Sequence, residues 1–548
     1  SAIAATSQDL NWINENILRY NKSIGQDHTI DALLGISVQE SQNNTTLGSV
    51  TGFPFNSIPK LSAGSTKTDA TSAATSWALV SYFARASYSF KGKYVFNASF
   101  RRDGSSRFGA NTQYGNFPSV SAAWNIKDET FMSSFSFLSN LKLRGSYGIT
   151  GNQEFGNFQY PSLYGVGNNY VDASVTATGG VAPTQLTNPN LSWEETQQVD
   201  VGLEIGLLSK VNITADYYIK QTDELLLNRP ILAVSGFNTI GQNIGSMENR
   251  GFEIGINATP VTSSSGLSWT TDFNIAFNRN KVVSLSDDVL PFASGFASWV
   301  EAGYAIGTFR GARVDGIFQT QEEINALDVA AQALYGPGSV YQSTLTRPGD
   351  FKFRDIDGDS RITSTDVEIL GNAQPQFIGG WTNNIQFKGI DFSFFFQFVQ
   401  GNKVWNHNRV FAEGMNSIFG QYNTTLNRWT PSNTETDVPR AVYADPNNNR
   451  RNSDHWLEDG SFIRLKNIVL GYTLPISIID RIGLSKFRVY AAAQNLLTFT
   501  DYSGFDPEVS TFTAGQNGNT AANAGTGTDF LTYPQARTIT LGVNLTLK

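Results

Sequence analysis

Three aspartates alternate with other residues in the segment 355–366, which reads Asp-Ile-Asp-Gly-Asp-Ser-Arg-Ile-Thr-Ser-Thr-Asp. Oxygen ligands at positions 1, 3, 5, 9 and 12, with an apolar residue at position 8, have the spacing of an EF-hand-type calcium loop. Position 7 of such a loop supplies its backbone carbonyl. The predicted Ca²⁺ ligands are therefore Asp355, Asp357, Asp359, Arg361 (through its carbonyl), Thr363 and Asp366.

This segment departs from the EF-hand pattern at two positions. Ser360 stands where a glycine is expected, with Gly358 two residues earlier, and Asp366 is shorter than the usual glutamate. The alternative is an Asp- and Gly-rich surface turn held by hydrogen bonds from the aspartate side chains to the backbone. If calcium binds, we expect it to order the longest loop of the chain, which is a structural role.

Aromatic residues in the long loops are the second group that could bind a ligand. Rings of this kind stack on sugars or grip peptide side chains. The alternative is that they pack the loops together or contact a partner protein; Tyr422 belongs to the same group. The predicted ligand-binding residues are Trp299, Trp405, Trp429, Tyr443 and Trp456.

No catalytic site is expected. The three histidines, His28, His407 and His455, are far apart in sequence or share one loop, and the motifs GxSxG, GxxxxGK[ST] and HExxH do not occur. The pair Glu194-Glu195 could act as glycosidase acids, but paired carboxylates are common in a chain of 548 residues. We interpret this pair as part of a solvated wall and predict that the protein is not an enzyme.

The elements that position these residues are strands, best seen between residues 191 and 281. Val199, Val201 and Leu203 alternate with Asp200 and Gly202, and the same rule continues in the runs that follow. Side chains of a strand point to opposite faces with period two, so each run has one apolar and one polar face. Runs of about 10 to 15 residues match tilted membrane-spanning strands and exceed the usual globular strand of about 5 to 6.

Composition agrees with a membrane barrel whose lumen contains water. The chain has 50 Gly, 38 Phe, 20 Tyr and 10 Trp but only 16% charged residues, which suits aromatic girdles and an uncharged lipid face. It has no cysteine, so disulfides and Cys-based metal sites are excluded. The net charge of −8 argues against a nucleic-acid partner. No run of 18 apolar residues exists, which excludes a helical membrane span.

The alternation predicts fifteen antiparallel strands, joined by connections that are alternately short and long. Short connections correspond to periplasmic turns and long ones to extracellular loops of an outer-membrane barrel, with outer-membrane lipid around it. The predicted strands cover 8–21, 27–39, 75–90, 93–103, 117–126, 140–150, four runs between 191 and 281, 375–388, 390–401, 461–474, 486–499 and 535–548. The major predicted loops cover 40–73, 151–190, 282–374, 402–460 and 500–533.

An odd number of strands does not suit a single-chain bacterial barrel, in which the number is even. Residues 1–7 also lack the basic and apolar stretches of a signal peptide. We therefore expect residues 1–548 to be one transmembrane portion of a larger barrel.

Eight short motifs are spread along the chain. They are Leu191-Ser192-Trp193-Glu194-Glu195-Thr196, Ala215-Asp216-Tyr217-Tyr218-Ile219-Lys220, Glu248-Asn249-Arg250-Gly251-Phe252-Glu253, Asp355-Ile356-Asp357-Gly358-Asp359, Ile463-Arg464-Leu465-Lys466-Asn467, Leu470-Gly471-Tyr472, Gln494-Asn495-Leu496 and Asp506-Pro507-Glu508. Together they resemble the SusC/RagA-like TonB-dependent transporters of Bacteroidetes outer membranes. The resemblance covers the chain from about residue 8 to its end, and the combination is specific although each motif alone is weak.

The resemblance implies a 22-strand barrel with an N-terminal plug, of which this chain would supply about fifteen C-terminal strands without the plug. It also implies import of oligosaccharides or peptides with a SusD-like surface lipoprotein, driven by the TonB complex through the N-terminal portion of the same protein. Three alternatives remain: a plug-less barrel used as an anchor or secretion component, a secreted β-rich adhesin, and a surface glycosidase.

Overall fold

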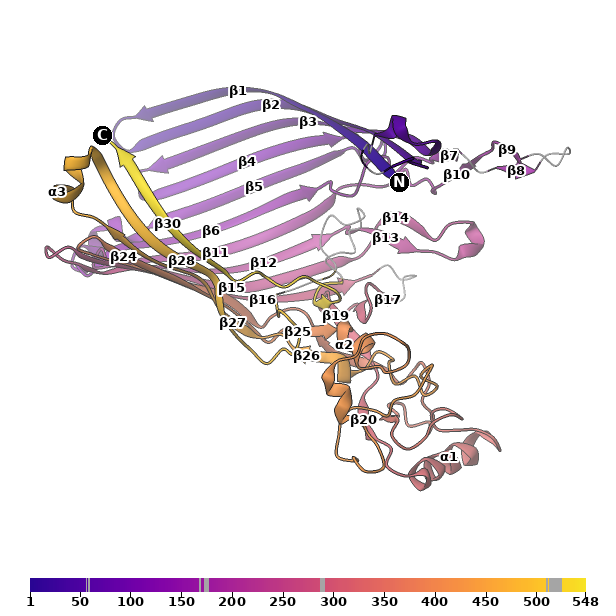
Figure 1. Cartoon of the computed structure of the whole chain (residues 1–548). Helices are drawn as coiled ribbons and strands as arrows, with labels where there is room; N and C mark the ends of the chain where they lie inside the picture. Colours follow the sequence, from indigo (N-terminus) through magenta and orange to yellow (C-terminus); the bar gives the residue numbers. More distant parts are fainter. Residues whose placement is uncertain are drawn as a thin grey trace. The chain divides into compact units, whose positions relative to one another are not determined.

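The principal sheet contains fifteen strands that pair in the order in which they occur along the chain (Figure 1). The computed structural model describes all residues except 56, 58–59, 167–168, 172–176, 286–290, 509–510 and 512–524. The strands of this sheet are β1 (Ala2–Ile24), β2 (His28–Thr51), β3 (Thr66–Phe90), β4 (Tyr94–Ser105), β5 (Tyr114–Asn125), β6 (Leu138–Asn152), β11 (Glu194–Leu207), β12 (Val211–Asp223), β15 (Ser246–Thr262), β16 (Leu267–Ser284), β23 (Phe377–Phe387), β24 (Ile390–Gln400), β27 (Phe462–Thr473), β28 (Leu484–Thr500) and β30 (Thr538–Leu547).

Each of the fifteen predicted ranges overlaps one strand of this sheet and extends at most three residues beyond it, because apolar and polar residues alternate over most of the range. Neighbouring strands pair in antiparallel fashion, for example with Ala86 opposite Ala98 and Leu470 opposite Ala491. Lys91 and Gly92 join β3 to β4 with φ angles of 54° and 66°, the left-handed conformation that two-residue hairpin turns require.

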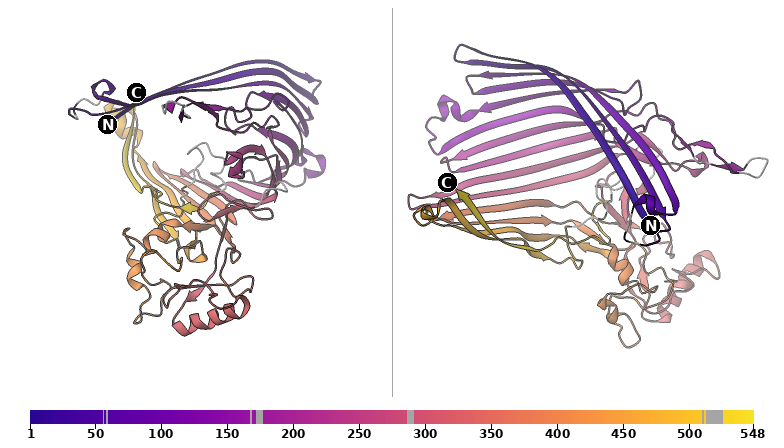
Figure 2. Two further views of the ribbon diagram at one scale, coloured as in Figure 1. Left: turned by 90° about the vertical axis from the view of Figure 1, so that its right-hand side faces the viewer. Right: turned by 45° about the horizontal axis from the view of Figure 1, so that its top comes forward.

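The predicted loop 40–73 is wrong over most of its length. Strand β2 continues to Thr51 and β3 begins at Thr66, so the connection covers only residues 52–65. The prediction failed because a Ser-, Thr- and Asn-rich composition was interpreted as a loop. β-Branched threonines fit a pleated strand equally well, and the backbone hydrogen bonds of the ladder do not depend on apolar side chains. Figure 2 shows β1, β2 and β3 continuing side by side over this length.

Two compact units can be distinguished, and each is described separately. The first comprises residues 1–134, 142–202 and 219–246, and the second comprises residues 135–141, 203–218 and 247–548. The shorter strands of the first unit are β7 (Tyr164–Val166), β8 (Tyr170–Val171), β9 (Ala177–Thr178), β10 (Val181–Pro183), β13 (Leu226–Pro230) and β14 (Thr239–Asn243).

The second unit contains long connections with secondary structure of their own, which gathers at one end of its long strands (Figures 1 and 2). Its short strands are β17 (Phe292–Ala293), β18 (Ser298–Val300), β19 (Thr308–Gly311), β20 (Val314–Ile317), β21 (Phe351–Phe353), β22 (Glu368–Asn372), β25 (Lys403–Asn406), β26 (Leu457–Asp459) and β29 (Thr528–Asp529). Its helices are α1 (Gln321–Tyr335), α2 (His407–Ala412) and α3 (Ile476–Ile479).

Helix α1 begins and ends at recognisable signals. The Thr320 hydroxyl accepts a hydrogen bond from the Glu323 amide at 3.3 Å, and Gly336 follows the helix with a φ of 91°. Among the described residues, no helix is both long and apolar enough to cross a membrane.

The loops of the second unit bury a core that is separate from the faces of the sheet. Phe309, Phe353, Trp405 and Trp456 are all 0% exposed and pack together with other apolar residues of β19, β21, β25 and the segment before β26. This core fixes the segments that carry most of the predicted site residues.

Candidate functional site

The acidic segment 355–366 folds as a compact loop in which the aspartates accept backbone hydrogen bonds. Asp355 accepts from the amides of Gly358 and Ser360, both at 2.7 Å. Carboxylate oxygens of Asp355, Asp357 and Asp359 lie within 4.8 Å of one another. Converging carboxylates are the ligands that Ca²⁺ prefers, so these three side chains fit a calcium ion.

Ser360 adopts a φ of 64°, the left-handed conformation for which calcium loops use glycine at this position. Ser360 therefore adopts the backbone conformation expected at this position of a calcium loop, but with strain that a glycine would not have. Gly358, with a φ of 77°, supplies a second left-handed position.

Asp366 is separate from the group of three aspartates. It is 1% exposed, and its two oxygens accept hydrogen bonds from the amides of Ile356 and Thr363 at 2.8 and 2.7 Å. It thus fastens the two ends of the loop together. The Thr363 hydroxyl pairs with that of Thr365 at 2.7 Å.

Helix α1 contacts the loop through Tyr335. Its hydroxyl donates to Asp359 at 3.1 Å, and the Arg361 guanidinium lies 4.9 Å from the centre of its ring. The hydrogen bond to Asp359 raises the pKa of Tyr335 above its ordinary value, with smaller contributions from burial and the aspartate charge. The loop is therefore braced from outside the aspartate cluster.

The predicted ligand-binding aromatics separate into buried and accessible residues. Trp405 and Trp456 are fully buried, and Trp429 is buried with its indole nitrogen donating to Gln319 at 2.9 Å. Their burial favours the alternative that they pack the loops together. Tyr443 is 81% exposed, and Trp299 is partly exposed. Ligand binding by Trp299 and Tyr443 stays a prediction.

Two motifs noted in the sequence meet in a buried ion network. Arg464 on β27 is 2% exposed and contacts Asp506 at 2.5 Å and Glu508 at 2.9 Å. Lys466 reaches the same Glu508 carboxylate at 2.6 Å. Burial alone would raise the pKa of Asp506, but the hydrogen bonds from Arg464 and two amides hold it below its ordinary value. The network fastens loop 500–533 to the sheet.

A second charged cluster holds loop 402–460. Arg409 on α2 contacts Glu413 at 2.9 Å and Glu458 at 3.1 Å, and Asn406 donates to the same Glu458 at 3.0 Å. Sequence reasoning missed both clusters. Arg409 and Glu413 have the i,i+4 spacing of a helix, but no spacing rule links Arg409 with Glu458 or Arg464 with Asp506, which are 49 and 42 positions apart.

The histidines of the second unit are structural. His407 stacks on Phe296 with ring centres 3.8 Å apart and accepts a hydrogen bond from the Trp405 indole at 3.1 Å. Burial, helped by the charge of Arg450, lowers the pKa of His407 to about 4. Burial likewise lowers the pKa of His455 to about 4. In the described part of the chain, neither neutral ring forms a hydrogen bond with a serine hydroxyl.

The glycosidase alternative would use Glu194 as a catalytic acid, but the fold already uses this side chain as a hydrogen-bond acceptor. Glu194 accepts hydrogen bonds from the Asn152 side chain and the Leu226 amide, each at 3.1 Å. The neighbouring Trp193 is 5% exposed and packs between Phe108 and Phe117, with ring centres 5.2 Å from each. The motif around Trp193 therefore builds a core in the first unit.

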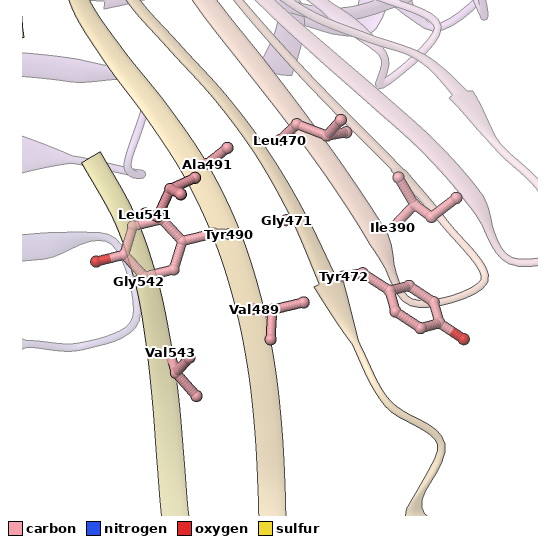
Figure 3. Close-up of a pocket in the computed structure, with 10 residues that line it drawn as sticks. All are labelled: Ile390, Leu470, Gly471, Tyr472, Val489, Tyr490, Ala491, Leu541, Gly542 and Val543. Atoms are coloured by element: carbon pink, nitrogen blue, oxygen red, sulfur yellow. The ribbon is translucent and has the colours of Figure 1, made fainter. Parts of the chain in front are cut away.

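A hollow of about 690 Å³ lies on the apolar face of the sheet in the second unit, among Leu470, Tyr472, Ala491, Leu541 and Val543 (Figure 3). Leu470 is 54% and Leu541 81% exposed, so this face is apolar and open. Such a surface suits the acyl chains of a membrane and offers few polar groups to a soluble ligand.

Comparison with known proteins identifies the family. Residues 3–496 match the model of the TonB dependent receptor-like β-barrel. TonB-dependent receptor P3 of Formosa agariphila is 35% identical over 98% of the chain and 52% of its own length. TonB-dependent receptor SusC of Bacteroides thetaiotaomicron is 31% identical over 96% of the chain and 49% of its own length.

A solved structure described as the RagAB peptide transporter matches 99% of the chain and 56% of its own chain, with a TM-score of 0.83 and 27% identity. The chain spans about half the length of the curated relatives it matches. The family is one of receptors and transporters, and the resemblance predicted from the sequence motifs is confirmed. The chain belongs to the TonB dependent receptor-like β-barrel family, with SusC and RagA among its relatives, and is an outer-membrane protein.

Proposed function

We propose that this chain is the C-terminal barrel portion of an importer that carries oligosaccharides or peptides across the outer membrane. The observation that carries the proposal is the match to the RagAB peptide transporter over 99% of the chain at a TM-score of 0.83. The 31% identity to SusC supports the same kind of nutrient import.

The proposed partners follow from the same relatives. A SusD-like lipoprotein would cover the long loops, and the TonB complex would act through an N-terminal portion that supplies the plug and the remaining strands of a 22-strand barrel. The edge strands β1 and β30 support closure by further strands, since an open sheet edge in lipid leaves backbone groups unpaired.

Uptake by living cells tests the proposal. A strain lacking the gene should lose energy-dependent accumulation of a labelled oligosaccharide mixture or peptide digest, and the restored gene should recover it. A strain without TonB should behave like the deletion. Uptake that persists without TonB would favour the plug-less anchor or secretion component instead.

Electrophoresis of the protein from outer membranes tests the barrel separately. An unboiled sample should migrate differently from a boiled one, because a closed barrel resists detergent. Solubility without detergent and no change on boiling would exclude both the barrel and the importer.

We also propose that segment 355–366 binds Ca²⁺ and that the ion orders the loop. Asp355, Asp357 and Asp359 would hold it, as supported by the convergence of their oxygens within 4.8 Å. Arg361, Thr363 and Asp366 remain predicted ligands, although Asp366 would exchange amide hydrogen bonds for the ion. The ion would neutralise like charges that otherwise repel one another.

A further inference from the structure

A polar cavity of about 400 Å³ lies among the loops of the second unit. Its wall combines Trp299 of β18, Arg310 of β19, the end of the acidic loop at Thr363 and Ser364, and the segment from Asn448 to Asn452. This volume lies within the range of small-molecule sites, which typically join an aromatic wall to a few polar groups.

Arg451 is the most unusual residue of this cavity. Its guanidinium lies 4.2 Å from the centre of the Phe353 ring, and its Nε donates to the Asn448 carbonyl at 3.3 Å. Within the described ranges, no carboxylate lies at ion-pair distance from it, and its terminal nitrogens have no hydrogen-bond partner. Burial lowers the pKa of Arg451, and the charges of Asp445 and Asp366 offset this effect only in part.

Arg310 contributes a second positive charge that is weakly neutralised. Its guanidinium lies 5.2 Å from the Trp299 ring centre, and the carboxylate of Glu301 is 3.8 Å away. At 3.8 Å the two groups attract each other but do not form a hydrogen bond.

The carboxylate in the wall does not neutralise these arginines by contact. Among the described residues that line the cavity, Asp366 is the single acidic one, and backbone amides occupy both its oxygens. The cavity thus presents two guanidinium groups, the amide of Asn448 and the hydroxyl of Ser364.

We propose that this cavity binds the oxyanion group of a ligand, a carboxylate or a sulfate, with Arg451 as the principal contact. Guanidinium groups bind such groups with two parallel hydrogen bonds, and Arg451 has its terminal nitrogens available. Arg310 and Asn448 add further donors, and the partly exposed Trp299 supplies an apolar wall for the rest of the ligand. The oxyanion could come from an acidic saccharide or from the C-terminus of a peptide.

The inference rests on the proposed function only for the nature of these two ligand sources. Binding is measured on the intact protein purified in a neutral detergent, without TonB or membrane energy. A failure of binding therefore leaves the uptake result unaffected, and a failure of uptake leaves the binding result unaffected.

Calorimetric titration at low ionic strength should use matched charged and neutral probes. The pairs are galacturonate with galactose, galactose 6-sulfate with galactose, and acetyl-dialanine with its C-terminal amide. We expect the charged member of at least one pair to bind saturably and its neutral counterpart to bind at least about tenfold more weakly, as expected for one lost charge-assisted contact. The pair that responds identifies the source.

The substitution Arg451→Gln should weaken the charged probe about tenfold or more. Asn448→Gly, which suits the φ of 57° at this position, should weaken it about twofold to threefold and leaves the core intact. Arg354→Gln is the matched control, since this arginine pairs with Asp315, does not line the cavity and carries the same charge.

Hydrogen exchange of the Phe353 strand checks that the Arg451 variant still folds. No saturable binding of any charged probe by about 10 mM, an affinity of about −3 kcal/mol, would overturn the inference. Equal binding of charged and neutral probes would overturn it too. So would an Arg354→Gln variant that loses as much affinity as Arg451→Gln.

Discussion

The long strands and the long loops of the second unit place their apolar residues in opposite ways. On β24 and β27, Ile390 is 45% and Leu470 54% exposed, whereas Phe309 and Trp405 in the loops are completely buried. The strands are held by backbone ladders and leave their apolar face to the membrane. The loops behave like a small water-soluble domain, with an apolar core and buried ion pairs. The strands of this unit are therefore adapted to lipid, whereas its loops are adapted to water.

The largest expected effect comes from removing the loop core. Trp405→Ala should cost the loops about 3 to 5 kcal/mol, because it deletes a buried indole and leaves a cavity. Hydrogen exchange should show faster opening of β19, β21 and β26, while the barrel keeps its heat-modifiable migration. Tyr443→Ala, at an 81% exposed position, should change the opening free energy by less than about 0.5 kcal/mol. Simultaneous loss of the barrel would contradict two separately stabilised regions.

Two ion pairs of equal length sharpen the comparison. Arg464–Asp506 and Lys548–Asp480 both measure 2.5 Å, but the first pair is buried and the second is about half exposed. Asp506→Asn should destabilise loop 500–533 by about 3 to 5 kcal/mol, because it removes the negative charge that pairs with the buried Arg464. Asp480→Asn should cost less than about 1 kcal/mol. Equal effects in hydrogen exchange would show that burial does not determine how much each ion pair stabilises the fold.

The loop core should also depend on pH through His407. Its pKa is about 4 in the fold and about 6.5 when unfolded, so the unfolded chain takes up the proton first as the pH falls. The stabilisation is complete above about pH 6.5 and declines by about 3 kcal/mol as the pH approaches 4. His407→Gln should remove this part of the dependence and leave that of His455. The measurement is loop opening at several pH values, corrected for the intrinsic exchange rate; an unchanged profile would count against the buried neutral ring.

The smallest expected effect concerns calcium. If the ion binds, Ca²⁺ at about tenfold its dissociation constant should stabilise the loop around α1 by about 1.4 kcal/mol. Chelation should reverse the effect, and Asp357→Asn should weaken it. Asp315→Asn is a control outside the cluster, because this residue pairs with Arg354. Terbium luminescence provides an independent readout, and its absence in the native protein would exclude the metal site.

The positions of the strands could be predicted because alternation is local. Val199 to Leu207 or Ile539 to Leu547 reveal their two faces without knowledge of any partner. The error at residues 40–73 arose where both faces are polar, so that composition resembled a loop. There the ladder, not the side chains, decides the structure.

The candidate site was less predictable because its contacts join distant residues. Arg464 and Asp506 were both noted in motifs, but their pairing across 42 positions follows from the return of loop 500–533 to β27. The three aspartates share one short segment, so their convergence could be predicted from spacing. Burial of Trp405 could not, since an indole in a loop suits a ligand and a core equally.

The length of the first three strands determines how far they extend beyond the membrane. Strand β1 has 23 residues, β2 24 and β3 25, so at about 3.3 Å per residue each is about 75 to 83 Å long. At a tilt of about 45° they would rise about 55 Å, whereas the hydrocarbon layer measures about 30 Å. The Ser- and Thr-rich ends of β2 and β3 would then extend about 25 Å beyond the hydrocarbon layer, as a paired ladder and not as a flexible connection.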